Sequence, residues 1–247
     1  MAEQRVALVT GANTGIGFAI AERLLQDGFA LGYATRDRGD EERNACERLS
    51  AAGRVQWVSG DLANPAVPPR LVSETAEALG GLDVLVNNAG LTVAKPALEL
   101  TADDFDTIFA IDVRASFLAA QAAARAMWEG GGVIVNITSV HEHVPRVGFA
   151  LYASAKAALG MLTRALALEL APRVRVVSVA PGVIATERNV ADAQSLDVEV
   201  PLGRPGDPAE VAALVSYVVS DDARYVTGTS YVIDGGMIQQ VFEHPAG

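Results

Sequence analysis

The segment VALVTGANTGIGFAIAERLL, residues 6–25, decides the fold. Residues 6–9 form a continuous apolar run, which is typical of a strand buried on both faces. A glycine-rich turn follows, and the apolar residues then recur at helical spacing from residue 18 to residue 25, until Gly28 ends the helix. A strand, a glycine turn and a helix in this order predict the first unit of an α/β sheet.

The glycine turn reads TGANTGIG, with Gly11, Gly15 and Gly17 at the spacing G-x-x-x-G-x-G. This spacing differs from the common G-x-G-x-x-G dinucleotide turn. Bare backbone amides at a helix N-terminus suit a pyrophosphate, so the turn predicts a dinucleotide site. The alternative is that the glycines serve only a tight turn and close helix packing.

Apolar runs and helical patterns alternate along the rest of the chain. The further expected strands are residues 29–34, 55–58, 84–86, 133–137, 174–179 and 231–233. The further expected helices are residues 40–52, 71–79, 101–127, 152–170 and 207–219. No linker, repeat or low-complexity tract divides them. The pattern predicts one domain over residues 1–247, an α/β fold with a Rossmann-type doubly wound parallel sheet of about seven strands and helices on both faces.

Composition and charge narrow the class of protein. With 50% hydrophobic residues, the 247-residue chain can bury a large core. The net charge of −11 argues against a nucleic-acid partner, because a phosphate backbone would be repelled. Cys46 is the single cysteine and the three histidines lack zinc-ligand spacing, so we expect a reducing compartment and no metal. The start MAEQR has no signal-peptide pattern and no apolar run looks long enough to span a bilayer, so we expect a cytoplasmic protein without membrane contact.

The end of the second expected strand selects the cofactor, because the residue there meets the adenosine ribose. A carboxylate at this place favours NAD, whereas arginine accommodates the extra phosphate of NADP. Thr35 ends the strand and Arg36 follows, which favours NADP. Asp37 comes next, and a small change of register would turn it toward the ribose, so NAD is the alternative.

Other polar and glycine residues also follow expected strands. Asp61 and Leu62 follow the third strand, where Asp61 either receives the adenine amino group or opens the turn before the next helix. The sequence NNAG, residues 87–90, follows the fourth strand, and Pro181 and Gly182 follow the sixth. Because the carboxyl ends of parallel strands share one edge of the sheet, these segments should meet there.

The chemistry is expected in the stretch from Asn136 to Lys156. Ser139 follows the fifth strand, and Tyr152 and Lys156 open a helix at a four-residue spacing that puts both on one face. A cation beside a phenol stabilises the phenolate, so Tyr152 can pass a proton, and Ser139 can donate a hydrogen bond to the same substrate oxygen. Alone, such a pair is more often a solvated helix face with an aromatic anchor, so the context decides.

Residues 186–200 are less hydrophobic than their surroundings and carry no strong pattern. Beside the carboxyl ends of parallel strands, such a segment is typical of a substrate lid. A long surface excursion is the alternative.

Taken together, TGANTGIG, NNAG, Ser139, Tyr152-x-x-x-Lys156 and the PG pair resemble the short-chain dehydrogenase/reductase family over essentially the whole chain. The resemblance implies an NAD(P)-dependent oxidoreductase that interconverts an alcohol and a carbonyl by hydride transfer. It implies that Tyr152 is the acid/base, that Ser139 orients the substrate oxygen, and that Lys156 stabilises the phenolate and holds the nicotinamide ribose. Many members are tetramers packed through the helices that correspond to residues 101–127 and 152–170, so a homotetramer is expected.

The expected contacts to the cofactor combine the strand-end segments with this resemblance. They are Gly11, Asn13, Thr14, Gly15, Ile16, Gly17, Thr35, Arg36, Asp61, Leu62, Asn88, Ala89, Gly90, Tyr152, Lys156, Pro181, Gly182, Val183 and Thr186.

Asp112 departs from the family pattern. The family usually has an asparagine at this place on the long helix, where it orders a water that leads from the lysine to solvent. A carboxylate flanked by Ile111 and Val113 is usually exposed, although periodicity does not show which face it occupies. If Asp112 takes the relay role, it adds a negative charge near Lys156 and weakens the pull of that lysine on Tyr152.

The substrate is expected to be a sugar, a small polyol or a small ketone. The segment from Thr138 to Glu142 is similar to the one after the active-site serine of glucose 1-dehydrogenases, and His141 and Glu142 could hydrogen-bond extra substrate hydroxyls. The same scaffold serves 3-oxoacyl-carrier-protein reductases, which are the alternative. A dinucleotide-binding sensor without turnover is an alternative of another class, which Ser139, Tyr152 and Lys156 make improbable.

Overall fold

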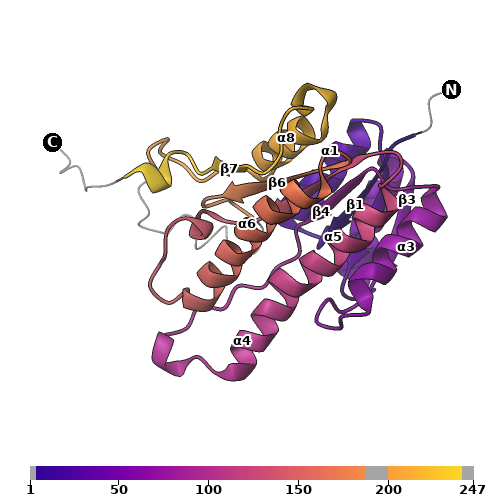
Figure 1. Ribbon diagram of the computed structural model, residues 1–247. Helices are drawn as coiled ribbons and strands as arrows, with labels where there is room; N and C mark the ends of the chain where they lie inside the picture. The colour runs from indigo at the N-terminus through magenta and orange to yellow at the C-terminus, as the bar shows by residue number, and fades with distance from the viewer. Residues whose placement is uncertain (1–3, 187–199, 241–247) are drawn as a thin grey trace.

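The computed structural model describes residues 4–186 and 200–240, which contain a seven-stranded sheet (Figure 1). The strands are β1 Val6–Thr10, β2 Ala30–Thr35, β3 Val55–Ser59, β4 Val84–Asn87, β5 Gly132–Ile137, β6 Val174–Pro181 and β7 Ser230–Ile233. Their order is β3-β2-β1-β4-β5-β6-β7, and every pairing is parallel. The predicted parallel α/β sheet is therefore confirmed.

Helices cover both faces of this sheet (Figure 1). The α-helices are α1 Gly15–Gln26, α2 Asp40–Ala52, α3 Val67–Leu79, α4 Ala102–Phe109, α5 Ala115–Ala126, α6 Ala150–Leu170 and α8 Pro208–Val219. Figure 1 shows α5 and α6 in front of the sheet, where they contact each other. Helices α1 and α8 pack together in the other layer.

Alternate residues of β1, β2, β4, β5 and β6 enter two separate hydrophobic cores, because successive side chains point to opposite faces of a sheet. Ala7 and Val9 of β1 belong to the core that includes α1 and α8. Val6 and Leu8 belong to the core that includes α3, α5 and α6. Both faces of these strands are buried, which explains why they are largely continuous apolar runs in the sequence.

The order of the strands reverses beside β1. From β1 the chain moves outward through β2 and β3 on one side, and it returns to continue through β4, β5, β6 and β7 on the other. The carboxyl ends of β1 and β4 therefore flank a crevice, which is where doubly wound sheets bind their ligands.

The single helix expected over residues 101–127 is divided in the structure. Thr101 and Asp104 form a complete capping box at the start of α4, as their spacing predicts. A π turn, Ala110–Arg114, then separates α4 from α5. Such a turn holds an extra residue and changes which side chains share a face, and no periodic pattern in the sequence indicates it.

The third helix begins earlier than expected. Helix α3 starts at Val67, and its first turn contains Pro68 and Pro69. Proline is tolerated in the first helical turn because its missing N–H would have no partner there. Of the predicted lid at residues 186–200, only Thr186 and Val200 lie within the described residues.

The run from Ala102 to Ala126 is 25 residues long, and its most apolar window has a mean hydropathy of 1.2. By length and composition it could cross a membrane, which corrects the expectation that no apolar run is long enough. Half of that window is buried inside the protein. Alanines of α5 such as Ala119 and Ala123 pack in the core beside α3, as expected for a helix that covers a sheet.

Candidate active site

The glycine turn forms a cradle at the carboxyl end of β1. Gly11 and Gly15 have φ values of +64° and +55°, which side chains other than glycine rarely adopt. A Cβ on Gly17 would collide with the Gly11 carbonyl and the Asn88 amide. Helix α1 starts at Gly15, and its N-cap Thr14 makes no side-chain hydrogen bond to the first turn. The amides of that turn are thus available to an anion, so the cradle fits a pyrophosphate.

The NNAG segment holds the cradle in shape. Asn88 donates through Nδ2 to the carbonyls of Thr10 and Gly11, at 2.9 and 3.0 Å. The Thr10 hydroxyl accepts from the amides of Asn88 and Ala89, at 3.0 and 3.1 Å. The ends of β1 and β4 are therefore tied together, and the Asn88 side chain supports the turn.

A cavity of about 570 Å³ lies along this crevice. Among its lining residues are fourteen of the expected cofactor contacts, namely Gly11, Asn13, Thr14, Gly15, Ile16, Gly17, Thr35, Arg36, Asp61, Leu62, Asn88, Ala89, Gly90 and Thr186. Tyr152, Lys156, Pro181, Gly182 and Val183 do not line it. The lining residues that the sequence reasoning did not assign to the cofactor are Thr10, Ala34, Glu42, Gly60, Leu71, Leu91 and Ile111.

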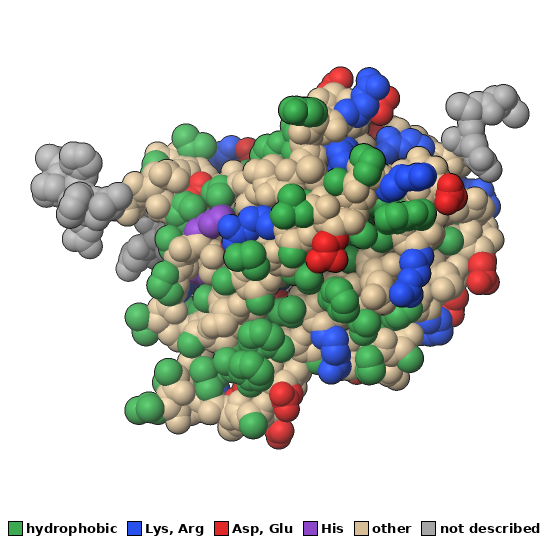
Figure 2. Space-filling model, viewed as in Figure 1, with side chains coloured by type: hydrophobic (Ala, Val, Ile, Leu, Met, Phe, Trp, Pro, Cys, Tyr) green, Lys and Arg blue, Asp and Glu red, His purple; other side chains and the backbone are tan. Residues whose placement is uncertain are grey.

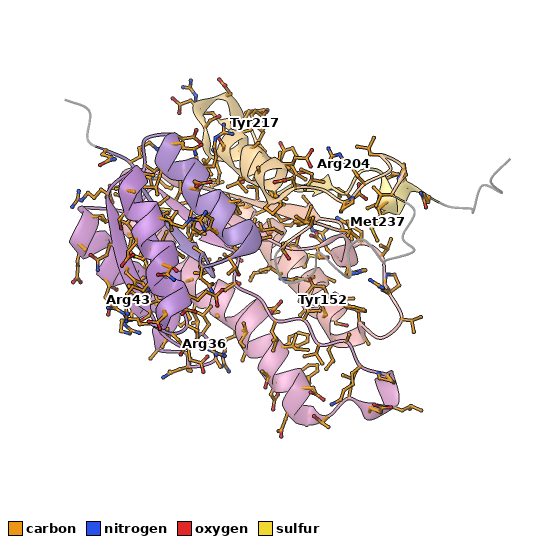
Figure 3. The ribbon with its side chains drawn as sticks, turned by 180° about the vertical axis from the view of Figure 1, so that it is seen from behind. Arg36, Arg43, Tyr152, Arg204, Tyr217 and Met237 are labelled. Atoms are coloured by element: carbon orange, nitrogen blue, oxygen red, sulfur yellow. The ribbon has the colours of Figure 1, made fainter. Side chains whose placement is uncertain are left out.

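The end of the cavity beside β2 carries both acidic and basic groups. The Thr35 hydroxyl donates to the Asp37 carbonyl at 2.6 Å and accepts from Trp57 Nε1 at 2.9 Å. Its donor is therefore engaged by a neighbouring residue of the protein. Arg36 is exposed and donates to the Asp37 carboxylate at 2.8 Å, a hydrogen bond that raises the pKa of Arg36. Glu42 also lines this end. Figure 3 shows Arg36 well apart from Tyr152.

Asp61 makes a local turn as well as lining the cavity. Its carboxylate accepts from the amide of Ala63 at 2.9 Å. Helix α3 begins at Val67 with Ala66 as its N-cap, so Asp61 opens the turn without capping the helix.

Ser139 and Tyr152 reach the same edge of the sheet from β5 and α6. Ser139 follows β5 and caps a short 3₁₀ turn, Val140–Glu142, where its hydroxyl accepts from the amide of His141 at 3.2 Å. Tyr152 and Lys156 occupy successive turns of α6, and Lys156 Nζ lies 5.6 Å from the centre of the Tyr152 ring. The structure thus brings the cation to the phenol, as their spacing predicts.

Lys156 is buried and charged. Its ammonium group donates to the Ile137 carbonyl at 3.3 Å and lies 3.0 Å from Asp112 Oδ2. Burial lowers the pKa of Lys156, but the attraction of Asp112 and Tyr152 and the hydrogen bond to Asp112 outweigh it. The pKa of Lys156 therefore lies above its ordinary value.

Asp112 is fully buried, so the structure shows which face it occupies, a point that the periodicity left open. It lies in the π turn, which directs it toward α6. Its Oδ1 accepts from the amide of Leu91 at 2.8 Å, while Oδ2 pairs with Lys156. A Cβ on Gly90 would lie 3.1 Å from both Asp112 Oδ2 and Lys156 Nζ. Asp112 therefore joins the loop after β4 to the lysine.

His141 faces Tyr152, whereas Glu142 turns away from it. The His141 ring meets the Tyr152 ring edge to face at 6.0 Å, and its Nδ1 lies 3.0 Å from the Val144 carbonyl. The Glu142 carboxylate lies against Gly160 of α6 and accepts from the Ser230 hydroxyl at 3.3 Å. Glu142 therefore lies away from Tyr152, against the expectation that it could meet substrate hydroxyls, because consecutive residues of a 3₁₀ turn point in different directions.

Known proteins resemble this chain over nearly its whole length. A family model described as enoyl-(acyl carrier protein) reductase matches residues 11–238. The uncharacterized oxidoreductase YohF of Escherichia coli K12 is 41% identical over 242 residues, covering 95% of this chain and 96% of the relative. The glucose 1-dehydrogenase of Gluconobacter oxydans is 34% identical over 241 residues, covering 93% and 90%. The crystal structure of acetoin dehydrogenase from Enterobacter cloacae aligns over 100% of both chains with a TM-score of 0.92 and 39% identity.

We predict that Asp112→Asn shifts the pH profile of carbonyl reduction. The substitution removes the negative neighbour of Lys156, so the remaining cation stabilises the Tyr152 phenolate more strongly. If Tyr152 donates the proton, as the family resemblance implies, reduction needs the protonated phenol, so the basic limb of the profile should move to lower pH by roughly half a unit to one unit.

The measurement is the initial rate of reduction against pH for the wild type and the variant. Asp103→Asn, which changes an exposed acid in the first turn of α4, is the control and should leave the profile in place. A limb that stays fixed or moves to higher pH in Asp112→Asn would show that the Asp112 charge does not act on Tyr152.

Proposed function

The chain belongs to the short-chain dehydrogenase/reductase family, and on that premise we propose an NADP-preferring enzyme that uses Tyr152 to interconvert an alcohol and a carbonyl. Relatives of this family are oxidoreductases that bind NAD(P), and the glycine cradle at β1 fits the pyrophosphate of such a cofactor. The observation that carries the proposal is the buried cation Lys156 beside the Tyr152 ring, together with the contact of that ring with His141, in the turn that Ser139 caps. A dinucleotide-binding sensor would need none of the side chains of Ser139, Tyr152 and Lys156.

Each of these side chains has a distinct task at the substrate oxygen. Tyr152 transfers the proton to or from that oxygen, and the Ser139 hydroxyl donates a second hydrogen bond to it. Lys156 has three N–H donors, of which two point at the Ile137 carbonyl and the Asp112 carboxylate. The third can donate to a ribose hydroxyl of the cofactor. The nicotinamide, when bound, supplies or accepts the hydride.

The substrate we propose is a small compound with an oxygen on the carbon next to the reacting carbon. Glucose and acetoin, in the names of two relatives, both have this arrangement. With a proton on Nδ1 for the Val144 carbonyl, His141 keeps Nε2 as an acceptor for a neighbouring hydroxyl. This favours sugars, vicinal diols and hydroxy ketones over 3-oxoacyl thioesters, which lack that hydroxyl.

NADP preference rests on Arg36. Its exposed guanidinium lines the end of the cavity beside β2, where a 2′-phosphate of the cofactor would lie. The carboxylate of Asp37, already bonded to Arg36, and that of Glu42 would oppose the phosphate. The net preference is therefore smaller than a lone arginine would produce.

A homo-oligomer is proposed from the face of α4, α5 and α6. Figure 2 shows hydrophobic side chains gathered on this part of the molecule. Phe105, Phe117, Met161 and Leu168 are 46%, 37%, 56% and 84% exposed. A groove of about 1020 Å³ with a largely apolar lining runs between these helices. A contiguous apolar patch of this kind on the surface of a protein indicates a contact with another chain.

We predict that Tyr152→Phe lowers turnover by about 10²–10⁴-fold, because only the hydroxyl that transfers the proton is removed. Initial rates are measured with both cofactors on a panel of aldoses, vicinal diols, hydroxy ketones, acetoacetyl thioesters and cyclic ketones. Cofactor affinity should stay within about threefold of the wild type. Tyr225→Phe, at a fully exposed tyrosine, is the matched control.

Unchanged turnover in Tyr152→Phe would remove this residue from the mechanism. Activity confined to acetoacetyl thioesters would replace the proposed substrate class with the acyl-reductase alternative. A wild type that binds cofactor but turns over nothing on the panel would favour the sensor.

We predict that NADPH binds more tightly than NADH, by about tenfold, and that Arg36→Ala abolishes the difference. Fluorescence titration with each cofactor provides the dissociation constants. Arg43→Ala is the control, because Arg43 is also an exposed arginine but pairs with Asp40 on α2. Tighter NADH binding that survives Arg36→Ala would identify Asp37 as the ribose ligand and NAD as the cofactor.

We predict a tetramer in solution, with four times the 25.7 kDa mass of the chain by light scattering. Met161→Glu places a charge in the centre of the apolar face and should yield smaller species. Met161→Leu is the control and should assemble as the wild type does. A wild-type monomer at micromolar concentration would contradict the prediction.

A further inference from the structure

We propose that Glu142 is a positioning residue, whose buried carboxylate clamps the turn carrying Ser139 and His141 onto helix α6 and strand β7. The inference rests on the proposed function, since the turn matters for catalysis only if Ser139 and His141 meet the substrate. The clamp itself is a structural arrangement that can be tested without a substrate.

The turn has one end fixed by the sheet. Residue Thr138, just before Ser139, donates through its amide to the Val179 carbonyl at 2.8 Å and continues the pairing of β5 with β6. From Ser139 on, the backbone of the turn is closed by its own hydrogen bonds. Glu142 donates through its amide to the Ser139 carbonyl at 2.8 Å, and His141 to the Ser139 hydroxyl at 3.2 Å.

Glu142 fixes the other end by lying across α6. Its side chain is 6% exposed, and its carboxylate fills the space that a side chain on Gly160 would occupy. A Cβ at Gly160 would collide with Oε1, Cδ and Cγ of Glu142. Glycine is the least favourable residue after proline in a helix interior, so its presence in a buried turn of α6 needs a reason. Room for Glu142 is that reason.

The two carboxylate oxygens join the turn to separate elements. Oε2 accepts from the hydroxyl of Ser230, the first residue of β7, at 3.3 Å. Oε1 lies 3.9 Å from Nε2 of the exposed His143. A buried carboxylate with so few partners is unfavourable for stability, as expected for a group retained for the position it enforces.

Direct contact between Glu142 and the reacting atoms does not fit this geometry. Gly160 lies eight residues beyond Tyr152 on α6, a separation of about 12 Å along the helix axis. The carboxylate therefore acts through the turn, by holding in place the Ser139 hydroxyl that caps it and the His141 ring that contacts Tyr152.

The experiment compares Glu142→Ala, Glu142→Gln, Gly160→Ala and the double variant Glu142→Ala/Gly160→Ala with the wild type. Glu142→Ala should lower kcat by about tenfold or more, because small misplacements of reacting groups have large effects, while cofactor affinity is unchanged. Glu142→Gln keeps the shape and the acceptor for Ser230, and should retain kcat within about threefold. Glu77→Ala removes an exposed glutamate of α3 and is the control.

Gly160→Ala tests the clamp from the side of the helix. It displaces the carboxylate and should lower kcat as Glu142→Ala does, and the double variant should be no worse than either single variant. Amide hydrogen exchange at His141, His143 and Val144 should accelerate in both single variants and stay slow in Glu142→Gln.

Wild-type kcat and wild-type exchange in Glu142→Ala would overturn the proposal, as would kcat losses that multiply in the double variant. Failure of Glu142→Gln to restore kcat would also overturn it, because a purely positional role needs shape and not charge. If the wild type turns over nothing on the panel, the proposed function fails, and the exchange measurement still decides whether the clamp exists.

Discussion

A chain of hydrogen bonds buried between the sheet and helices α5 and α6 holds the rest of the site in place. Asn87 donates through Nδ2 to Asn136 Oδ1 at 2.9 Å and to the Ser116 carbonyl of α5 at 3.2 Å. Asn136 donates in turn to the Thr163 hydroxyl of α6 at 2.8 Å. All four residues are buried, where a polar group left without a partner costs about 1–3 kcal/mol. The helices therefore have one favourable position along β4 and β5.

That position determines the charges around the phenol. Thr163 anchors α6, and Lys156 lies two turns before it, beside the end of β5. The π turn at the start of α5 brings Asp112 to the same place, where burial alone would lower the pKa of Lys156 and Asp112 reverses the effect. Tyr152 therefore faces an ion pair and not a lone cation. An asparagine in place of Asp112 would leave the cation without this counter-charge.

The fold could be predicted from the sequence because strands buried on both faces appear as apolar runs, and the runs from β1 to β7 alternate with helical patterns. The predicted helix boundaries were wrong at places where a few residues change the local backbone geometry. The start of α3 was predicted too late because Pro68 and Pro69 are residues that usually interrupt a helix. Both are tolerated here because they lie in its first turn. The division of the helix at Ala110–Arg114 has no composition signal, because a π turn needs no glycine or proline.

The sequence predicted those parts of the site that directly follow a strand, because the topology of the sheet determines where each strand ends. Ser139 and the segments after β1, β2, β3 and β4 all reach one edge by topology. Side-chain direction was not predictable in the same way, because it depends on what packs opposite. Asp112 points inward since Lys156 lies across from it, and Glu142 points away from Tyr152 since Gly160 leaves a space for it. A glycine inside the long apolar helix α6 was the one available signal, and a glycine so placed predicts a neighbour that must approach closely.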